Sequence, residues 1–272
     1  MESKIARTLG LKHAPVALLW SDIMPEGAMH FEKGRWGCVM AGFGAAAEKG
    51  KTYAFDRETF GCPGGGVGLG FGNCYTGFIG GIEGFCGFLS NGNEQSERGR
   101  KLIQIAEQYL RGTQLDHFKH GEAYRKNPET VQRFIAALPI MEVPTKYVLF
   151  KPLADVAECE RPVSVTFLAN PDQLSALVIL ANYEYGDGER AIIPHAAGCQ
   201  SIGIYGYREA KRDLPRAVVG HNDISARRTL RRLGKDLLTF TVPLALYAEM
   251  ENNVEGSFLD RETWKGLIAE GG

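Results

Sequence analysis

Residues 162–181 read Pro-Val-Ser-Val-Thr-Phe-Leu-Ala-Asn-Pro-Asp-Gln-Leu-Ser-Ala-Leu-Val-Ile-Leu-Ala, and the segment changes its periodicity halfway along. Its first part alternates apolar and polar residues from Val163 to Phe167, which predicts a half-buried strand. Asn170 followed by Pro171 is the start signal of a helix, because Asn accepts free N–H groups and proline fits the first turn. The apolar face that we expect to be buried holds Leu174, Leu177, Val178 and Ala181.

The same alternation of strands and helices extends outward in both directions. The apolar run at 15–20, the segment 146–150 and the segment 237–242 are each typical of a strand. Helices are expected at 36–48, at 102–109, from Pro128 to about Leu138, and from the Asp223 cap to Arg232, ending before Gly234. This order predicts an α/β or α+β protein with a mixed sheet and flanking helices.

The two ends of the chain share a weak pattern. Pro15–Trp20 resembles Pro162–Phe167, and each is followed by a turn with proline, a helix and a Gly-Cys pair. We therefore treat residues 1–272 as a single domain with pseudo-repeat halves at 1–145 and 146–272. A duplicated strand–helix–loop unit would bring Cys62 and Cys199 to equivalent places around a central site.

Composition narrows the class of protein. The chain has 272 residues, a formal net charge of -1 and an ordinary apolar fraction, so we expect neither nucleic acid nor an acidic membrane as a partner. The sequence has no apolar run of about 20 residues and begins without the apolar stretch of a signal peptide, which favours a cytoplasmic location. Thiols stay reduced in the cytoplasm, so six cysteines favour packing, metal ligation or redox chemistry over disulfides.

Residues 61–92 differ from the rest of the chain. Glycine is dense here, from Gly61-Cys62-Pro63-Gly64-Gly65-Gly66 onward, and such composition is costly in a regular helix or strand. Aromatic residues interleave with the glycines, which argues against a free linker. We expect a packed, irregular loop that approaches a ligand closely, and its aromatic residues are Phe71, Tyr75, Phe78, Phe85 and Phe88.

Cys62 is the sharpest candidate for a metal ligand. Pro63 fixes the backbone after it, and the N–H groups of Gly64 and Gly65 can turn toward a bound anion, as in backbone nests at iron–sulfur and phosphate sites. Cys38, Cys74 and Cys199 are the cysteines that could converge with it. Cys86 and Cys159 are expected to be packing residues.

Other motifs for catalysis are weak. Residues 64–72 lack the spacing of a dinucleotide-binding glycine loop, and the Gly-Lys-Ser/Thr of a phosphate-binding loop does not follow. The Gly-x-Ser-x-Gly motif of many hydrolases does not occur in the sequence.

At Gly61-Cys62-Pro63-Gly64 the chain resembles the domain-of-unknown-function-169 family, uncharacterised proteins that are frequent in anaerobic bacteria and archaea. The resemblance covers nearly the whole chain and includes Arg35–Cys38, Gly68–Phe71 and Phe88–Gly92. It continues through Gly121–Glu129, Phe150–Leu153, Gly198–Ser201 and Gly220–Arg227, although Asn222 stands where the family pattern has threonine. What it implies is that Cys38, Cys62 and Cys199 lie in the family's motifs, whereas Cys74 does not.

Our first hypothesis is a [4Fe-4S] cluster, an iron–sulfur site ligated by Cys38, Cys62 and Cys199, with Cys74 as fourth ligand. Asp223 and Arg227 are expected to contact these ligands or a substrate. The cluster would serve electron transfer or Lewis-acid chemistry, so the partner is a small molecule or an electron-transfer protein. An apolar glycine loop also fits burial in a homo-oligomer.

Two alternatives fit the same residues. The aromatic loop could enclose haem or flavin in a non-catalytic binding module, with a histidine as axial ligand of the haem. Alternatively, Cys62 could be the nucleophile of a thiol-dependent enzyme, which requires a depressed thiol pKa. The histidine candidates are His30, His117, His120, His195 and His221.

Overall fold

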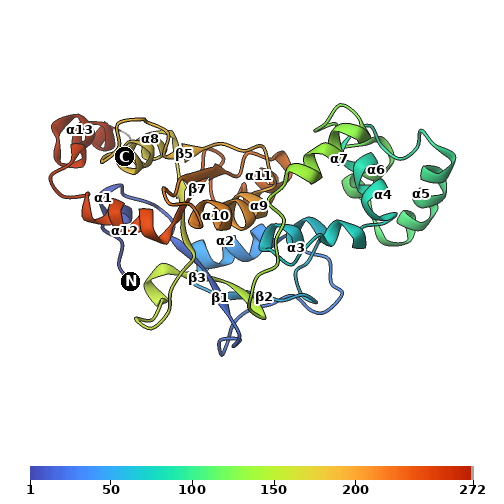
Figure 1. Cartoon of the computed structure of the whole chain (residues 1–272), viewed down its shortest axis with the longest axis horizontal. Coiled ribbons are helices and arrows are strands. Elements are labelled where there is room, and N and C mark those ends of the chain that lie inside the picture. The colour runs from blue at the N-terminus through green and yellow to red at the C-terminus, as the bar shows by residue number, and fades with distance from the viewer. Residues whose placement is uncertain (271–272) are drawn as a thin grey trace. The chain divides into compact units, whose positions relative to one another are not determined.

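The computed structural model describes residues 1–270, and the chain folds into two compact units (Figure 1). Unit 1 is formed by Met1–Phe71 together with Met141–Gly272, and unit 2 by Gly72–Ile140. Unit 1 contains the whole of the sheet, whereas unit 2 is helical.

Unit 1 is built on a seven-stranded mixed sheet in the order β2-β3-β1-β4-β7-β6-β5. All neighbouring strands are antiparallel except β5 and β6, which are parallel. Ala17 of the central strand β1 lies opposite Lys151 of β3 and Val165 of β4. The predicted mixed α/β architecture is confirmed. The strands are β1 (Val16–Ser21), β2 (Tyr53–Phe55), β3 (Tyr147–Pro152), β4 (Ser164–Ala169), β5 (Ala191–Ile192), β6 (Ala217–Gly220) and β7 (Leu238–Pro243).

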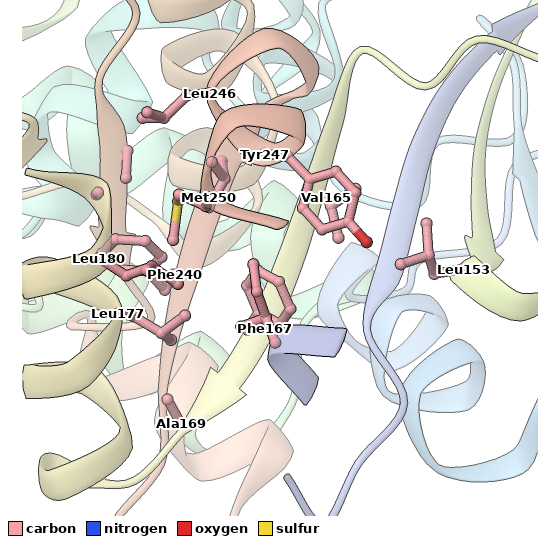
Figure 2. Close-up of a cluster of buried hydrophobic side chains, with 14 of the residues drawn as sticks. Leu153, Val165, Phe167, Ala169, Leu177, Leu180, Phe240, Leu246, Tyr247 and Met250 are labelled. Carbon is pink, nitrogen blue, oxygen red and sulfur yellow. The ribbon is translucent and has the colours of Figure 1, made fainter. Parts of the chain in front are cut away.

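One face of the sheet carries the main apolar core, which Figure 2 shows. Phe167 of β4 and Phe240 of β7 point from the strands into this core and are fully buried. Burying a side chain of this size stabilises the fold by about 1.5–3 kcal/mol. The helices that contribute to this core are α1 (Lys4–Thr8), α8 (Pro171–Ala181), α12 (Leu244–Asn252) and α13 (Glu262–Glu270).

The opposite face is covered by α2 (Val39–Lys49), α9 (Gly198–Ile202) and α10 (Ile204–Ala210). Phe43 of α2 packs on Phe150 of β3 with ring centroids 5.9 Å apart. Ser164, Thr166 and Thr241 of the sheet are buried here, and the hydroxyl oxygens of the two threonines lie 3.0 Å apart. The prediction of a half-buried β4 was therefore wrong, because helices cover its polar face too.

Local start signals placed several helices correctly. Asn127 accepts the Thr130 N–H at 2.9 Å and begins α7 (Pro128–Ala137). Asn170 and Gln173 form a capping box at the start of α8. Asp223 begins α11 (Ile224–Leu230), which ends earlier than the predicted Arg232.

The prediction of an irregular loop over residues 61–92 was wrong. Pro63–Leu69 forms helix α3, Cys74–Gly77 a 3-10 turn η1, and Gly81–Leu89 helix α4. Cys62 caps α3 through its sulfur and Pro63 occupies the first turn, so the local start signal outweighs the poor helix propensity of glycine.

Unit 2 packs α4, α5 (Glu97–Tyr109), α6 (Gly112–His120) and α7 around aromatic side chains. Tyr75 stacks on Phe85 with centroids 4.0 Å apart. Phe78 contacts Phe85, Phe88 and Phe118. These aromatic residues therefore form the core of unit 2.

The predicted duplication of the halves 1–145 and 146–272 is not confirmed. The half 1–145 contributes only β1 and β2 to the sheet, whereas the half 146–272 contributes the other five strands. In addition, the helix after β1 covers one face of the sheet and the helix after β4 covers the other, because Phe43 of α2 packs on Phe150 whereas Leu177 of α8 lies in the main core.

Candidate thiol site

Three cysteines of unit 1 lie at the beginnings of three helices. Cys38 is the N-cap residue of α2, and Cys62 is the N-cap residue of α3. Cys199 is the second residue of α9 and is buried. Each therefore sits where a chain segment enters a helix, with its direction fixed by the backbone.

Helix α3 packs closely against α9, and glycine makes this approach possible. A Cβ atom on Gly68 would lie 2.8 Å from the sulfur of Cys199, which is closer than real Cβ contacts allow. A Cβ atom on Gly203 would overlap the carbonyl oxygen of Gly68. The glycines of α3 and α9 are thus required for the close contact that brings Cys62 and Cys199 to the same region.

Main-chain groups of α3 contact two of the sulfurs. The Gly65 N–H donates to Sγ of Cys62 at 3.2 Å. Sγ of Cys199 donates to the carbonyl oxygen of Gly64 at 3.4 Å. The sequence pointed to Gly64 and Gly65 as backbone donors and ligand contacts. Main-chain groups of both residues do contact the thiols, but Gly64 contributes an acceptor and not a donor.

Neighbouring thiols contribute to the raised pKa values of Cys62 and Cys199. Burial raises the pKa of Cys62 to about 12, and the charge of Cys38 adds to this shift. Burial, followed by the charges of Cys62 and Cys38, raises the pKa of Cys199 well above its usual range. Burial also raises the pKa of Cys38, while hydrogen bonds from Met40 N–H and Thr229 oppose the shift. All three groups are therefore neutral thiols near pH 7.

This direction is opposite to that required of a nucleophilic cysteine. A catalytic thiol is activated by a depressed pKa, usually beside a cation. The pKa of Cys62 is instead raised to about 12, which does not favour a Cys62 nucleophile.

Asp223 connects the thiol region to helix α11. Its Oδ2 accepts the Gly198 N–H at 2.6 Å, directly before Cys199, and its Oδ1 accepts the Ala226 N–H at 2.7 Å. Burial raises the pKa of Asp223, while these hydrogen bonds oppose the shift. Both carboxylate oxygens thus hold the starts of α9 and α11 together, so Asp223 positions the Cys199 segment.

Arg227 lies one turn further along α11 and binds main-chain carbonyl groups. Its guanidinium donates to the carbonyl oxygen of Leu237 at 3.2 Å and to that of His221 at 3.5 Å. Arg227 therefore fixes the chain on both sides of α11, and its charge acts on the imidazole of His221.

The remaining cysteines are distributed over both units. Cys74 lies in η1 of unit 2, and Cys86 is buried in α4 of the same unit. Cys159 is exposed in unit 1, between β3 and β4. Within residues 1–270, no group of three or more His, Cys, Asp or Glu side chains is arranged to hold a metal ion.

The residues expected to line a haem or flavin pocket are separated or packed. Phe71 belongs to unit 1, whereas Tyr75, Phe78 and Phe88 belong to unit 2 and contact other rings of its aromatic core. Their mutual packing leaves those ring faces occupied by protein side chains rather than by a planar ligand.

Of the candidate histidines, His221 stands out. Its side chain is buried and its Nδ1 atom has no hydrogen-bond partner, whereas His30, His120 and His195 are exposed. Sequence reasoning treated it only as one of several haem ligands. Its place directly after a short apolar strand and before the Asp223 cap was the available signal.

Two further neighbours of the thiols were missed. Sδ of Met40 lies close to Gly198, because a Cβ atom there would be 3.1 Å from it. Thr229 hydrogen-bonds Cys38 from α11. Neither residue has a sequence signal, since only the tertiary packing of α2, α9 and α11 brings them to the cysteines.

Comparison with known proteins identifies a family. Residues 4–253 match the model of the DUF169 family, which is described as "Uncharacterised ArCR". No match was found among curated proteins or among solved structures. None of the described helices is both long and apolar enough to cross a membrane.

Proposed function

The chain belongs to the DUF169 family, and we propose that Cys38, Cys62 and Cys199 bind a metal cofactor through thiolate sulfur, with an iron–sulfur cluster as the first candidate. The observation that carries the proposal is the approach of thiols from separate segments of unit 1: Sγ of Cys199 donates to the carbonyl oxygen of Gly64 in the helix that Cys62 begins, and the charge of Cys38 contributes to the raised pKa of both Cys62 and Cys199. Cysteines that serve only as packing residues do not need to converge in this way.

The raised pKa values support a cationic ligand. Three buried thiols that ionised without one would repel one another, so each stays protonated. A bound metal ion supplies the compensating charge and deprotonates a coordinating thiol outright. The site is therefore suited to thiolates only when a metal centre is present.

A cluster is the first candidate because its ligands bind separate irons and need not meet around one ion. Four sulfurs about 2.3 Å from one zinc ion lie within about 4 Å of each other. The described side chains do not form a group of three for such an ion. In a cluster the ligands bind irons at separate corners, so the thiolates are spaced more widely.

The main chain around Cys62 supports the same interpretation. The Gly65 N–H already points to Sγ of Cys62 at 3.2 Å, and hydrogen bonds to ligating sulfur are one of the factors that set a cluster's potential. When bound, such a cluster would supply electron transfer or a Lewis-acidic iron. Asp223 would then hold the Cys199 segment in place.

Anaerobic reconstitution with iron and sulfide tests the proposal. We expect the wild-type chain to bind both, and Cys38→Ser, Cys62→Ser and Cys199→Ser each to lose most of the bound iron while remaining folded. Cys159→Ser is the matched control, because Cys159 is exposed and should not matter. Unchanged iron content in Cys62→Ser would refute the proposal. A haem or flavin spectrum would favour the binding-module alternative.

A further inference from the structure

The turn between β6 and α11 has an unusual backbone. His221 directly follows β6 and has φ +61°, a left-handed conformation that is uncommon outside glycine, although Asn, Asp and His adopt it more often than other residues. Its side chain is only 2% exposed. A buried histidine in this conformation is held by its surroundings, and such positions are frequent at functional sites.

Three buried polar atoms at this turn have no hydrogen-bond partner. They are Nδ1 of His221, Oδ1 of Asn222 and Oγ1 of Thr239. Thr239 lies beside this turn, because it is the β7 partner of Gly220. A Cβ atom on Gly220 would lie 2.9 Å from Oγ1 of Thr239. More than nine in ten buried polar groups are paired in folded proteins, so three unpaired atoms at one turn indicate a missing partner.

The charge at the turn indicates the sign of that partner. Arg227 donates to the main-chain oxygens of His221, Leu237 and Lys235, and within residues 1–270 it forms no ion pair with a carboxylate. Burial and the charge of Arg227 lower the pKa of His221 to about 4, so the imidazole is neutral at pH 7. Asp223 next to it already accepts two N–H groups. A guanidinium without a carboxylate partner, beside hydrogen-bond donors, favours an anion.

We infer that the β6–α11 turn binds a small oxygen-bearing anion, a carboxylate or an inorganic oxyanion, through His221 and Thr239 beside Arg227. The imidazole N–H and the threonine hydroxyl donate to the anion, and Arg227 supplies the positive charge. Asn222 Oδ1 accepts a hydroxyl group of the ligand where there is one. The assignment of this anion as a substrate of the metal site rests on the proposed function, whereas its binding does not.

Histidine NMR on the full-length chain, as purified, tests the inference. The side chains are labelled with ¹⁵N-histidine, and acetate, sulfate and inorganic phosphate are each titrated at an ionic strength held constant with chloride. We expect one of the six histidines to show a saturable shift with at least one anion. His221→Asn identifies this signal, because asparagine tolerates positive φ and removes only the imidazole. In that variant the signal is absent and binding, measured by calorimetry, is weakened.

Arg227→Gln and Arg228→Gln form the matched pair, since Arg228 is an exposed neighbour on the same helix. We expect the first to weaken binding roughly tenfold, because hydrogen bonds to charged groups contribute about 1.5–3 kcal/mol. The second should bind as wild type does. Equal weakening in both variants, or no saturable shift with any of the anions, would refute the inference.

A crystal structure grown with the binding anion separates a ligand from water. Density for the anion at His221 supports the inference, and a single water that satisfies Nδ1 and Oγ1 in its presence overturns it. Iron and sulfide are measured on the same samples. A chain that binds the anion without iron would refute the proposed function alone, and one that binds iron without the anion would refute this inference alone.

Discussion

The glycine-rich stretch of residues 61–92 is divided between the two units, and its two parts use glycine differently. In unit 1, Gly65 and Gly68 lie in a helix and leave room for neighbouring segments, including the sulfur of Cys199. In unit 2, glycines accompany aromatic side chains that pack on one another. Similar composition thus produces a close contact between helices around cysteines in one unit and an aromatic core in the other.

Unit 2 also uses glycine where two loops cross. Cβ atoms on Gly92 and Gly121 would overlap the carbonyl oxygens of Lys119 and Ser90. The Glu122 N–H donates to the Phe88 carbonyl oxygen at 2.8 Å across this crossing. The glycine contacts of unit 1 lie beside the cysteines of the proposed site, whereas those of unit 2 let two loops cross.

The largest effect is expected from the core of unit 2. Phe118 is fully buried against Phe78, so Phe118→Ala should lower the free energy of unfolding of unit 2 by about 4 kcal/mol. Hydrogen exchange should lose protection in α4 and α6, and the iron content should stay unchanged. Trp20, Trp36 and Trp264 all lie in unit 1, so tryptophan fluorescence reports that unit separately.

Loss of iron in Phe118→Ala, with intact tryptophan fluorescence, would contradict the division of roles between the two units. It would show that the aromatic core of unit 2 is needed for cofactor binding and does more than fold that unit.

The next effect concerns pH. The pKa of His221 is lowered to about 4 in the folded chain from 6.5 when unfolded. The unfolded chain therefore binds a proton first as pH falls, and stability that is present above pH 6.5 is lost between pH 6.5 and pH 4. The loss is about 3 kcal/mol, since one pKa unit corresponds to about 1.4 kcal/mol.

Urea unfolding at a series of pH values measures this loss. His221→Asn is the control, because it removes the titrating group and should flatten the profile over the same interval. An equally steep profile in His221→Asn would assign the acid sensitivity to other groups.

A smaller effect is expected at the contact between α3 and α9. Gly68→Ala places a methyl group 2.8 Å from Sγ of Cys199, so overpacking should cost about 2 kcal/mol and lower iron binding. Gly266→Ala in α13 is the matched control, since its Cβ has open space and alanine favours a helix by about 1 kcal/mol. Thermal unfolding and iron content are measured on both variants. Wild-type iron binding in Gly68→Ala would show that the close contact is not needed for the site.

Much of the fold could be predicted from local signals. The apolar β1 segment and the Asn-Pro starts of α7 and α8 are local signals that do not depend on distant residues. The structure confirms the strand and the two helices that they predict. Helix α3 could not be predicted, because its glycines are poor helix formers and only the packing of α9 makes their small size useful. The burial of both faces of β4 could not be predicted either, because it depends on which helices pack on the strand from elsewhere in the chain.

The candidate site shows the same division. Residue type and glycine turns pointed to Cys38, Cys62 and Cys199, and in the structure these three lie at the starts of α2, α3 and α9. Thr239 could not be chosen from the sequence, because only the pairing of β6 with β7 places it beside the His221 turn. The sequence also offered no way to see that Cys74 falls in the other compact unit.

Native mass spectrometry of the full-length chain, purified without oxygen, tests most directly whether an iron–sulfur cluster is bound through Cys62. We expect the wild-type chain to carry a mass excess equal to an iron–sulfur cluster, and Cys62→Ser to have the mass of the bare polypeptide. A wild-type chain with no mass excess, or with the mass of one zinc ion, would contradict this proposal.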